Sequence, residues 1–354
     1  MADKIIRMGI IGYGGMARFH HKQIQEKKLT GIKPVVAYDI ADAANQVAKN
    51  AGLRVCSSAA ELLNKDEIDL VLIATPNDWH KPYALQAMDA GVNVICEKPA
   101  TLCSDDWQEM VDKANKTGLM LTVHQNRRWD PDYLSVLKVR DEGTIGNIFK
   151  IESRVSGANG VPGGWRASKP EGGGMVLDWG VHLLDQICDA YKEKITQIYA
   201  RVQRITTQEV DDGFMVVMTF ETGMVAVVEV TTTTYIKYPR WHVSGLYGSL
   251  QIDEWDLTGK VVREVAEQDH DDLVAIQAGV GLTKTMAPRS ADSIQELPVP
   301  KCEQAWDEFY KNIIAHLNHG EPIIVTHEQV MRVMKVMEAI FQSEAENRAI
   351  DVSL

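Results

Sequence analysis

Cysteine is scarce in this chain and follows no pattern. Five cysteines occur among 354 residues, and no two of them form a Cys-x-x-Cys pair. A disulfide-stapled domain or a zinc knuckle needs closely spaced, paired cysteines, so their odd number and wide separation argue against both. We therefore expect reduced thiols, a cytoplasmic protein and no metal centre. The five are Cys56, Cys96, Cys103, Cys188 and Cys302.

Long apolar runs and positive charge are also lacking. No apolar stretch approaches the length of a membrane span, and the first residues lead directly into a strand-like segment, so we expect neither a membrane anchor nor a signal peptide. A net charge of -12 argues against nucleic acid or an anionic membrane as the partner. No repeat of about 20 to 50 residues is present. With 45% hydrophobic residues, the chain is long enough for two folded domains.

The first informative motif is a glycine-rich turn that follows the strand expected at 5–11. Gly12 allows a tight turn, Gly14 lets a pyrophosphate approach the backbone, and Ala17 keeps the following helix close to the strand. The helix N-terminus then offers free N–H groups to phosphate. A glycine-rich turn without a ligand is the alternative interpretation. The predicted cofactor-binding turn is Gly12, Tyr13, Gly14, Gly15, Met16 and Ala17.

The next strand, 34–39, ends at Asp39, which is placed to accept hydrogen bonds from a ribose. The residues after it supply no arginine for a 2′-phosphate, so we expect NAD in preference to NADP. Strands and helices alternate from there to His124, which predicts a doubly wound parallel sheet, a Rossmann domain over residues 1–125. Polar residues stand at the carboxyl ends of its strands, where such sheets bind ligands.

Lys98 follows an apolar strand directly, at that same edge. A cation there can polarise a substrate oxygen, although most lysines are merely solvated. Pro99 stiffens the exit from the strand, and the sequence does not tell whether the bond before it is cis.

The stretch 171–185 is where we expect the chemistry. Three glycines precede an apolar run, and on an α-helix Asp178, His182 and Asp185 would fall within an arc of about 60°. A structural hydrogen-bonded trio and a metal site are the alternatives for these three residues.

Residues 126–354 predict a second, α+β domain with a large open sheet, mainly antiparallel, closed by helices at 303–318 and 327–347. Arg127 and Arg128 follow the last parallel strand. The glycine-rich loop 157–174 resembles a substrate lid in which Trp165 and Arg166 would contact a sugar, or Trp165 would only pack the loop. The polar segment 266–293 is expected to be an irregular insertion, and its Lys284 and Arg289 could touch substrate.

Taken together, these motifs resemble the Gfo/Idh/MocA family of NAD(P)-dependent sugar and polyol oxidoreductases over nearly the whole chain. The resemblance rests on Gly12-x-Gly14-x-x-Ala17, Ala74-Thr75-Pro76-Asn77-x-x-His80, Glu97-Lys98-Pro99, Asn126-Arg127-Arg128-Trp129-Asp130 and the block from Gly172 to Asp185. It implies that Lys98, Asp178 and His182 are catalytic, that Thr75, Pro76, Asn77, His80 and Glu97 line the cofactor, and that the open sheet forms a dimer or tetramer interface.

The resulting hypothesis is NAD-dependent oxidation of a secondary hydroxyl on a sugar, glycoside or cyclic polyol. His182 would act as the base, Lys98 would stabilise the oxygen, and Asp178 would orient His182 or share a proton relay. The expected substrate contacts are Lys98, Arg127, Trp165, Arg166, Asp178 and His182. Two alternatives stay open: an NAD-dependent glycosidase that oxidises C3 and then eliminates the aglycone, and a non-catalytic NAD-binding regulator.

Overall fold

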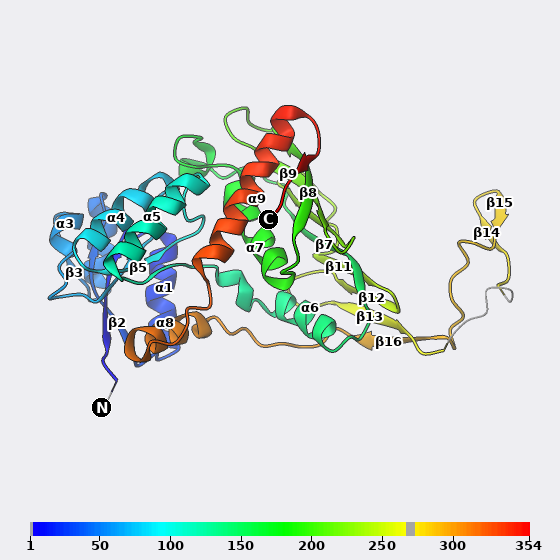
Figure 1. Ribbon diagram of the computed structural model, residues 1–354, viewed down its shortest axis with the longest axis horizontal. Helices are drawn as coiled ribbons and strands as arrows, with labels where there is room; N and C mark the ends of the chain where they lie inside the picture. The colour runs from blue at the N-terminus through cyan, green and yellow to red at the C-terminus, as the bar shows by residue number, and fades with distance from the viewer. Residues whose placement is uncertain (1–2, 267–272) are drawn as a thin grey trace.

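The computed structural model describes residues 3–266 and 273–354, whose two large sheets lie in adjacent domains (Figure 1). The first is a six-stranded parallel sheet in the order β3-β2-β1-β4-β5-β6. Its strands are β1 (Ile6–Ile11), β2 (Ile32–Tyr38), β3 (Arg54–Val55), β4 (Leu70–Ile73), β5 (Asn93–Cys96) and β6 (Leu121–Val123). The central strand β4 is buried along its whole length, as expected for apolar runs that are covered on both faces.

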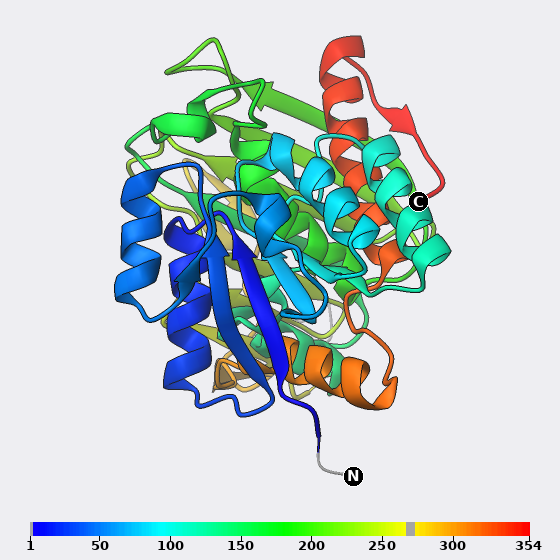
Figure 2. The ribbon, with the colours of Figure 1, turned by 90° about the vertical axis from the view of Figure 1, so that its left-hand side faces the viewer.

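The helices between these strands are α1 (Gly15–Glu26), α2 (Asp42–Asn50), α3 (Ala59–Leu62), α4 (His80–Asp89) and α5 (Ser104–Thr117), seen against the sheet in Figure 2. The strand order reverses between β1 and β4. Connections therefore leave to opposite sides at this point, which opens a crevice at the carboxyl ends of the strands. The predicted Rossmann domain is confirmed.

The second sheet has nine strands in the order β16-β13-β12-β11-β7-β10-β9-β8-β17, and every neighbouring pair is antiparallel except β7 and β10. Alternating burial along β9 shows that one face is packed and the other is more open. The helices α6 (Pro131–Asp141), α7 (Val181–Ala190) and α9 (His327–Glu346) lie on the packed face (Figure 1). The strands are β7 (Ile148–Ser156), β8 (Ile195–Gln203), β9 (Gly213–Phe220), β10 (Val225–Thr231), β11 (Trp241–Gly245), β12 (Gly248–Ile252), β13 (Gly259–Glu264), β16 (Ile294–Pro298) and β17 (Ile350–Asp351).

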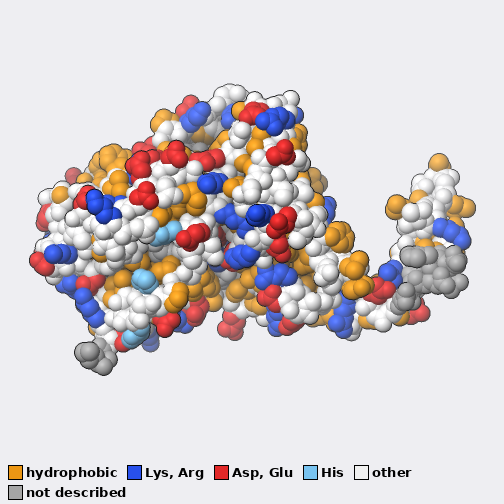
Figure 3. All heavy atoms as spheres, in the orientation of Figure 1, with side chains coloured by type: hydrophobic (Ala, Val, Ile, Leu, Met, Phe, Trp, Pro, Cys, Tyr) orange, Lys and Arg blue, Asp and Glu red, His pale blue; other side chains and the backbone are white. Residues whose placement is uncertain are grey.

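The segment expected to be an irregular insertion contains regular structure. A hairpin of β14 (Ile276–Ala278) and β15 (Gly281–Thr283) projects away from the body of the protein (Figures 1 and 3), and β16 then adds an edge strand beside β13. Such short sequences carry little strand signal, because the pairing partner rather than local propensity decides such strands. The part of the expected insertion at 267–272 lies outside the described residues.

Helix α8 (Asp307–His319) comes late in the chain but packs on the first domain beside α1 (Figures 1 and 2). Tyr310 hydrogen-bonds to His20 of α1, and the ring of Phe309 lies 4.8 Å from that of His124. The predicted domain boundary between residues 125 and 126 therefore stays a prediction, because α8 belongs to the later part of the chain but packs on the first domain. Within 3–266 and 273–354, no helix combines the length and the apolar character needed to span a membrane.

Candidate active site

A cavity of about 490 Å³ lies at the carboxyl ends of β1, β2, β4 and β5. Gly12 has a φ of +84°, and a Cβ there would approach the Ala74 carbonyl oxygen to 2.7 Å, so only glycine fits. A Cβ on Gly14 or Gly15 would instead enter open space. The first turn of α1 has no side-chain cap, so its N–H groups are free for an anion. This cradle fits the phosphates of a dinucleotide.

Most of the predicted cofactor residues line this cavity, while others lie behind it. Tyr13 is buried with its hydroxyl 2.7 Å from His21 Nδ1, and Ala17 is fully buried on the inner face of α1. His80 links two cofactor-side loops through the carbonyls of Thr75 and Pro99. The lining comprises Ile11, Gly12, Gly14, Gly15, Met16, Tyr38, Asp39, Ile40, Ala74, Thr75, Pro76, Asn77, Trp79, Tyr83, Glu97, Lys98, Trp165, Arg166 and Glu171.

Asp39 is held at the cavity edge by backbone groups. Its carboxylate accepts hydrogen bonds from the N–H of Tyr13 at 2.6 Å and of Ala41 at 2.8 Å. These bonds join the end of β2 to the glycine-rich turn, and they hold the carboxylate of Asp39 at the position predicted to bind the ribose.

Lys98, after β5, reaches across to the second domain. Its ammonium group donates to the carbonyl oxygen of Asp178 at 2.9 Å and to Oδ1 of the same residue at 3.0 Å. Arg166 from the loop before α7 donates from Nε to the other carboxylate oxygen at 2.9 Å. Burial raises the pKa of Asp178, but the two cations outweigh this effect and hold it below its usual value. The bond between Lys98 and Pro99 is cis.

The expected continuous helix around Asp178 is interrupted. Residues Val176–Gly180 form a π-helical turn before α7 begins at Val181. Such turns are frequent at functional sites. The Asp178 carboxylate bonds to the two cations, and no side-chain hydrogen bond joins it to His182 within the part of the chain that the structure describes. The prediction that Asp178 orients His182 directly is therefore not supported by a contact.

His182 lies buried on α7, and its Nδ1 atom has no hydrogen-bond partner among the described residues. Burial lowers the pKa of this imidazole well below its usual value, and the positive charge of Lys98 lowers it further. The ring is thus neutral at neutral pH and is free to accept a proton.

Asp185, the third member of the predicted stripe, belongs to a different contact. It forms a bidentate ion pair with Arg128, with both N···O distances at 2.7 Å. Both side chains are buried. The carboxylate therefore anchors α7 to the turn after β6, and the expectation of three aligned chemical groups is wrong for Asp185.

Arg127 packs against two adjacent indoles that the sequence analysis did not single out. Its guanidinium carbon is 4.5 Å from the ring centre of Trp179 and 5.1 Å from that of Trp255. The Trp179 ring lies in turn 6.1 Å from that of His182. Trp165, by comparison, stacks on Arg166. No local pattern reveals the two indoles, because they come from the π-helical turn and from the connection after β12.

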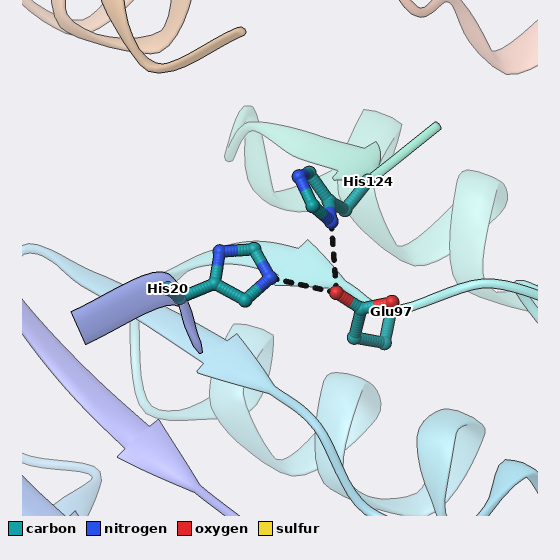
Figure 4. Close-up of side chains that lie close together, drawn as sticks. All are labelled: His20, Glu97 and His124. Carbon is teal, nitrogen blue, oxygen red and sulfur yellow. Dashed lines mark hydrogen bonds and ion pairs between the residues drawn. The ribbon is translucent and has the colours of Figure 1, made fainter. Parts of the chain in front are cut away.

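A buried cluster lies directly behind Lys98. Glu97 Oε1 accepts hydrogen bonds from His20 Nε2 at 2.7 Å and from His124 Nδ1 at 2.8 Å (Figure 4). Tyr310 bonds to the other nitrogen of His20. Burial and the neighbouring His124 lower the pKa of His20 to about 4. The three ligand-type atoms are close enough for a metal ion, but the two hydrogen bonds already account for their proximity. We assign the cluster to fixing the strand ends that carry Lys98.

Lys284 and Arg289 do not reach this site in their own chain. Lys284 directly follows β15 in the projecting hairpin (Figure 1), and Arg289 pairs with Glu264 at 2.9 Å. Their expected contact with substrate is therefore wrong within one chain.

Comparison with known proteins agrees with the fold of both domains. Residues 6–125 match the oxidoreductase family with an NAD-binding Rossmann fold, and residues 133–251 match the Gfo/Idh/MocA C-terminal domain. An NAD-binding protein from Listeria innocua is similar over 99% of this chain and 100% of its own, with 41% identity and a TM-score of 0.94. The scyllo-inositol 2-dehydrogenase (NADP+) of Bacillus subtilis is 24% identical over 98% of this chain and 95% of its own length.

A D-glucoside 3-dehydrogenase of Escherichia coli is 28% identical over 52% of this chain and 54% of its own. The two matched segments lie in the two domains described above and together span more than half of the chain. The chain belongs to the Gfo/Idh/MocA family of oxidoreductases.

Proposed function

We propose that this protein is an NAD-dependent dehydrogenase that oxidises a secondary hydroxyl of a sugar, glycoside or cyclic polyol. One observation carries the proposal: the Lys98 ammonium, at the rim of the nucleotide cavity, meets Asp178 of the second domain at 3.0 Å, with His182 one turn further on. An alcohol bound there would lie beside a nicotinamide, which accepts a hydride when the cofactor is bound.

Lys98 has one donor left for substrate. An ammonium group carries three N–H donors, and Asp178 accepts two of them. The third is available to an alcohol oxygen, whose developing negative charge the cation would stabilise. Asp178, held also by Arg166, would keep this amine in place rather than orient the base.

His182 is the proposed general base. Its imidazole is neutral because of burial and the nearby Lys98 charge, so its free nitrogen can take the hydroxyl proton at neutral pH. A lowered pKa makes it a weaker base, and the charge on Lys98 compensates by lowering the pKa of the alcohol that it binds.

We propose NAD as the cofactor in preference to NADP. Asp39 stands in the lining of the cavity with its oxygens fixed by backbone N–H groups. A carboxylate at this position accepts from the ribose hydroxyls and repels a 2′-phosphate. A low Km for NAD together with a much higher one for NADP would support the assignment, and the reverse order would contradict it.

The experiment that tests the function is a substrate panel. Purified protein is incubated with monosaccharides, inositols and glycosides in the presence of NAD or NADP, and the absorbance of the reduced cofactor is followed. Accumulation of NADH supports a dehydrogenase. Release of aglycone without net NADH would favour the oxidation-elimination glycosidase. Nucleotide binding without turnover of any compound would favour the non-catalytic regulator.

We also propose that the protein is a homo-oligomer. The hairpin β14-β15 projects into solvent (Figure 3), and it and the residues that flank it carry four apolar side chains that are each at least 73% exposed: Val274, Val280, Leu282 and Met286. A two-stranded hairpin is marginal alone, and an apolar arm without its own core indicates a contact surface. A second copy offers the open face of the nine-stranded sheet as the matching partner. The five free thiols support a cytoplasmic location.

A further inference from the structure

The Arg127 side chain is fixed before any substrate arrives. Its guanidinium carbon lies 4.5 Å from the ring centre of Trp179 and 5.1 Å from that of Trp255, the two rings lie 6.3 Å from each other, and its Nη1 atom donates to Asp130 at 2.8 Å. The backbone carbonyl of Arg127 accepts a hydrogen bond from Gln186 at 2.7 Å. Stacking and one end-on ion pair therefore hold the guanidinium plane in a single orientation.

The opposite edge of this guanidinium has no partner. Nε is buried and without a hydrogen bond among the described residues, and Nη2 makes none with them either. Buried donors are nearly always hydrogen-bonded in folded proteins. An unpaired donor on a side chain held this firmly indicates a partner that the chain itself does not supply.

The position of Arg127 indicates what that partner is. Strands β5 and β6 run in parallel register, with Cys96 opposite Val123, so Lys98 and Arg127 leave adjacent strands at the same edge. Arg127 is absent from the lining of the nucleotide cavity, and the indole it stacks on lies 6.1 Å from the His182 ring. The unpaired edge thus belongs to the substrate side of the proposed reaction centre.

We propose that the Nε–Nη2 edge of Arg127 binds a carboxylate of the substrate, so that this enzyme oxidises a sugar acid in preference to a neutral sugar or polyol. This inference rests on the proposed function. The two N–H groups on that edge point in parallel and match the two oxygens of one carboxylate. A single hydroxyl would satisfy only one of them.

The test compares each neutral compound with its acid: glucose with gluconate and glucuronate, galactose with galacturonate, and myo-inositol as a further neutral polyol. With saturating NAD, we expect kcat/KM for at least one acid to exceed that of its neutral counterpart by about 100-fold or more, because two charge-assisted hydrogen bonds are gained. Arg127→Met should abolish most of this ratio. Arg127→Lys keeps the positive charge but lacks the two parallel N–H donors, so it should retain only a small part of the acid-to-neutral ratio.

Arg348→Met is the matched control, since Arg348 is exposed near the C-terminus, and it should leave the ratio unchanged. Equal turnover of acids and neutral compounds by the wild type would overturn the proposal, and so would an unchanged ratio of acid to neutral kcat/KM in Arg127→Met. Either result leaves the dehydrogenase assignment standing. The Nε–Nη2 edge of Arg127 would then bind water or a pair of neutral hydroxyl groups. Protein that binds NAD but oxidises none of these compounds would remove the dehydrogenase assignment, and this proposal with it.

Discussion

At the scale of single residues, burial and the charge of Lys98 set the protonation state of His182. Burial lowers its pKa, and Lys98 lowers it further. The ordinary imidazole pKa is about 6.5, so the folded protein keeps this ring neutral below the pH at which the unfolded chain protonates it. Stability contributed by the neutral ring is therefore present above about pH 6.5 and falls as the pH drops below it.

We expect the His182 ring to show no titration near pH 6.5 in NMR spectra of the imidazole groups, assigned by the loss of its signals in His182→Gln. Lys98→Met removes one positive charge and should raise the titration midpoint of the His182 ring.

His182→Gln should also reduce turnover by about 10²- to 10⁴-fold, the usual contribution of a general base, while nucleotide affinity stays unchanged. A wild-type midpoint near 6.5, or unchanged turnover in the variant, would contradict these assignments.

Two glycines of the first turn should separate folding from cofactor binding. Gly12→Ala places a Cβ 2.7 Å from a backbone oxygen at a positive φ, so we expect a loss of about 1–3 kcal/mol in the free energy of unfolding. Gly14→Ala meets no protein atom and should leave stability unchanged or slightly higher. It should nevertheless weaken NAD binding at least about tenfold by filling the phosphate cradle. Denaturant unfolding and NAD titration measure the two quantities, and normal NAD affinity in Gly14→Ala would exclude this placement of the phosphates.

At the scale of elements, α7 is anchored by one buried ion pair. Asp185 holds Arg128 through two short contacts, whereas Asp189 lies 3.3 Å from the same arginine and is partly exposed. Removing one partner of a buried pair leaves the other charge uncompensated. The consequence should be structural, because neither residue touches the nucleotide cavity.

We therefore expect Asp185→Asn to lower the free energy of unfolding by about 3–5 kcal/mol, and Asp189→Asn to cost clearly less. Urea denaturation of the two variants provides the comparison. The Km values of folded Asp185→Asn protein should match the wild type. A stable Asp185→Asn variant with lost turnover would instead indicate that Asp185 takes part in catalysis.

The π-helical turn at Val176–Gly180 is a feature that helical periodicity in the sequence does not predict. An α-helical register places Asp178, His182 and Asp185 on one stripe, and α7 itself is correctly predicted. The extra residue per turn at Val176–Gly180 redirects Asp178 toward Lys98 and Arg166. Backbone hydrogen-bond shifts of this kind depend on tertiary contacts, here with two cations from other segments, and leave no periodic signal in the sequence.

At the scale of the whole molecule, the hairpin β14-β15 should govern assembly. Val280→Asp combined with Leu282→Asp alters side chains that are exposed in the single chain, so we expect no loss of protomer stability. The mass from light scattering should fall to that of a smaller assembly, because charges would be buried at the contact. Val47→Asp, on α2 and also exposed, is the control. An unchanged mass in the double variant would exclude the arm as the contact surface.

From the order of apolar runs, glycines and polar strand ends, the sequence by itself determined the Rossmann domain, the mainly antiparallel second sheet, and the identity of Lys98, Asp178 and His182 as candidates. Local propensity and periodicity suffice for the two sheets because each reflects the burial of one strand or helix face, whereas the resemblance to the Gfo/Idh/MocA family is what names Lys98, Asp178 and His182 as catalytic. Only the tertiary structure decided that Asp178 bonds to Lys98, that Asp185 pairs with Arg128, and that two indoles far apart in the sequence pack together against Arg127. Side chains from separate domains meet at these points, and contacts between distant segments depend on how the domains pack rather than on any local pattern.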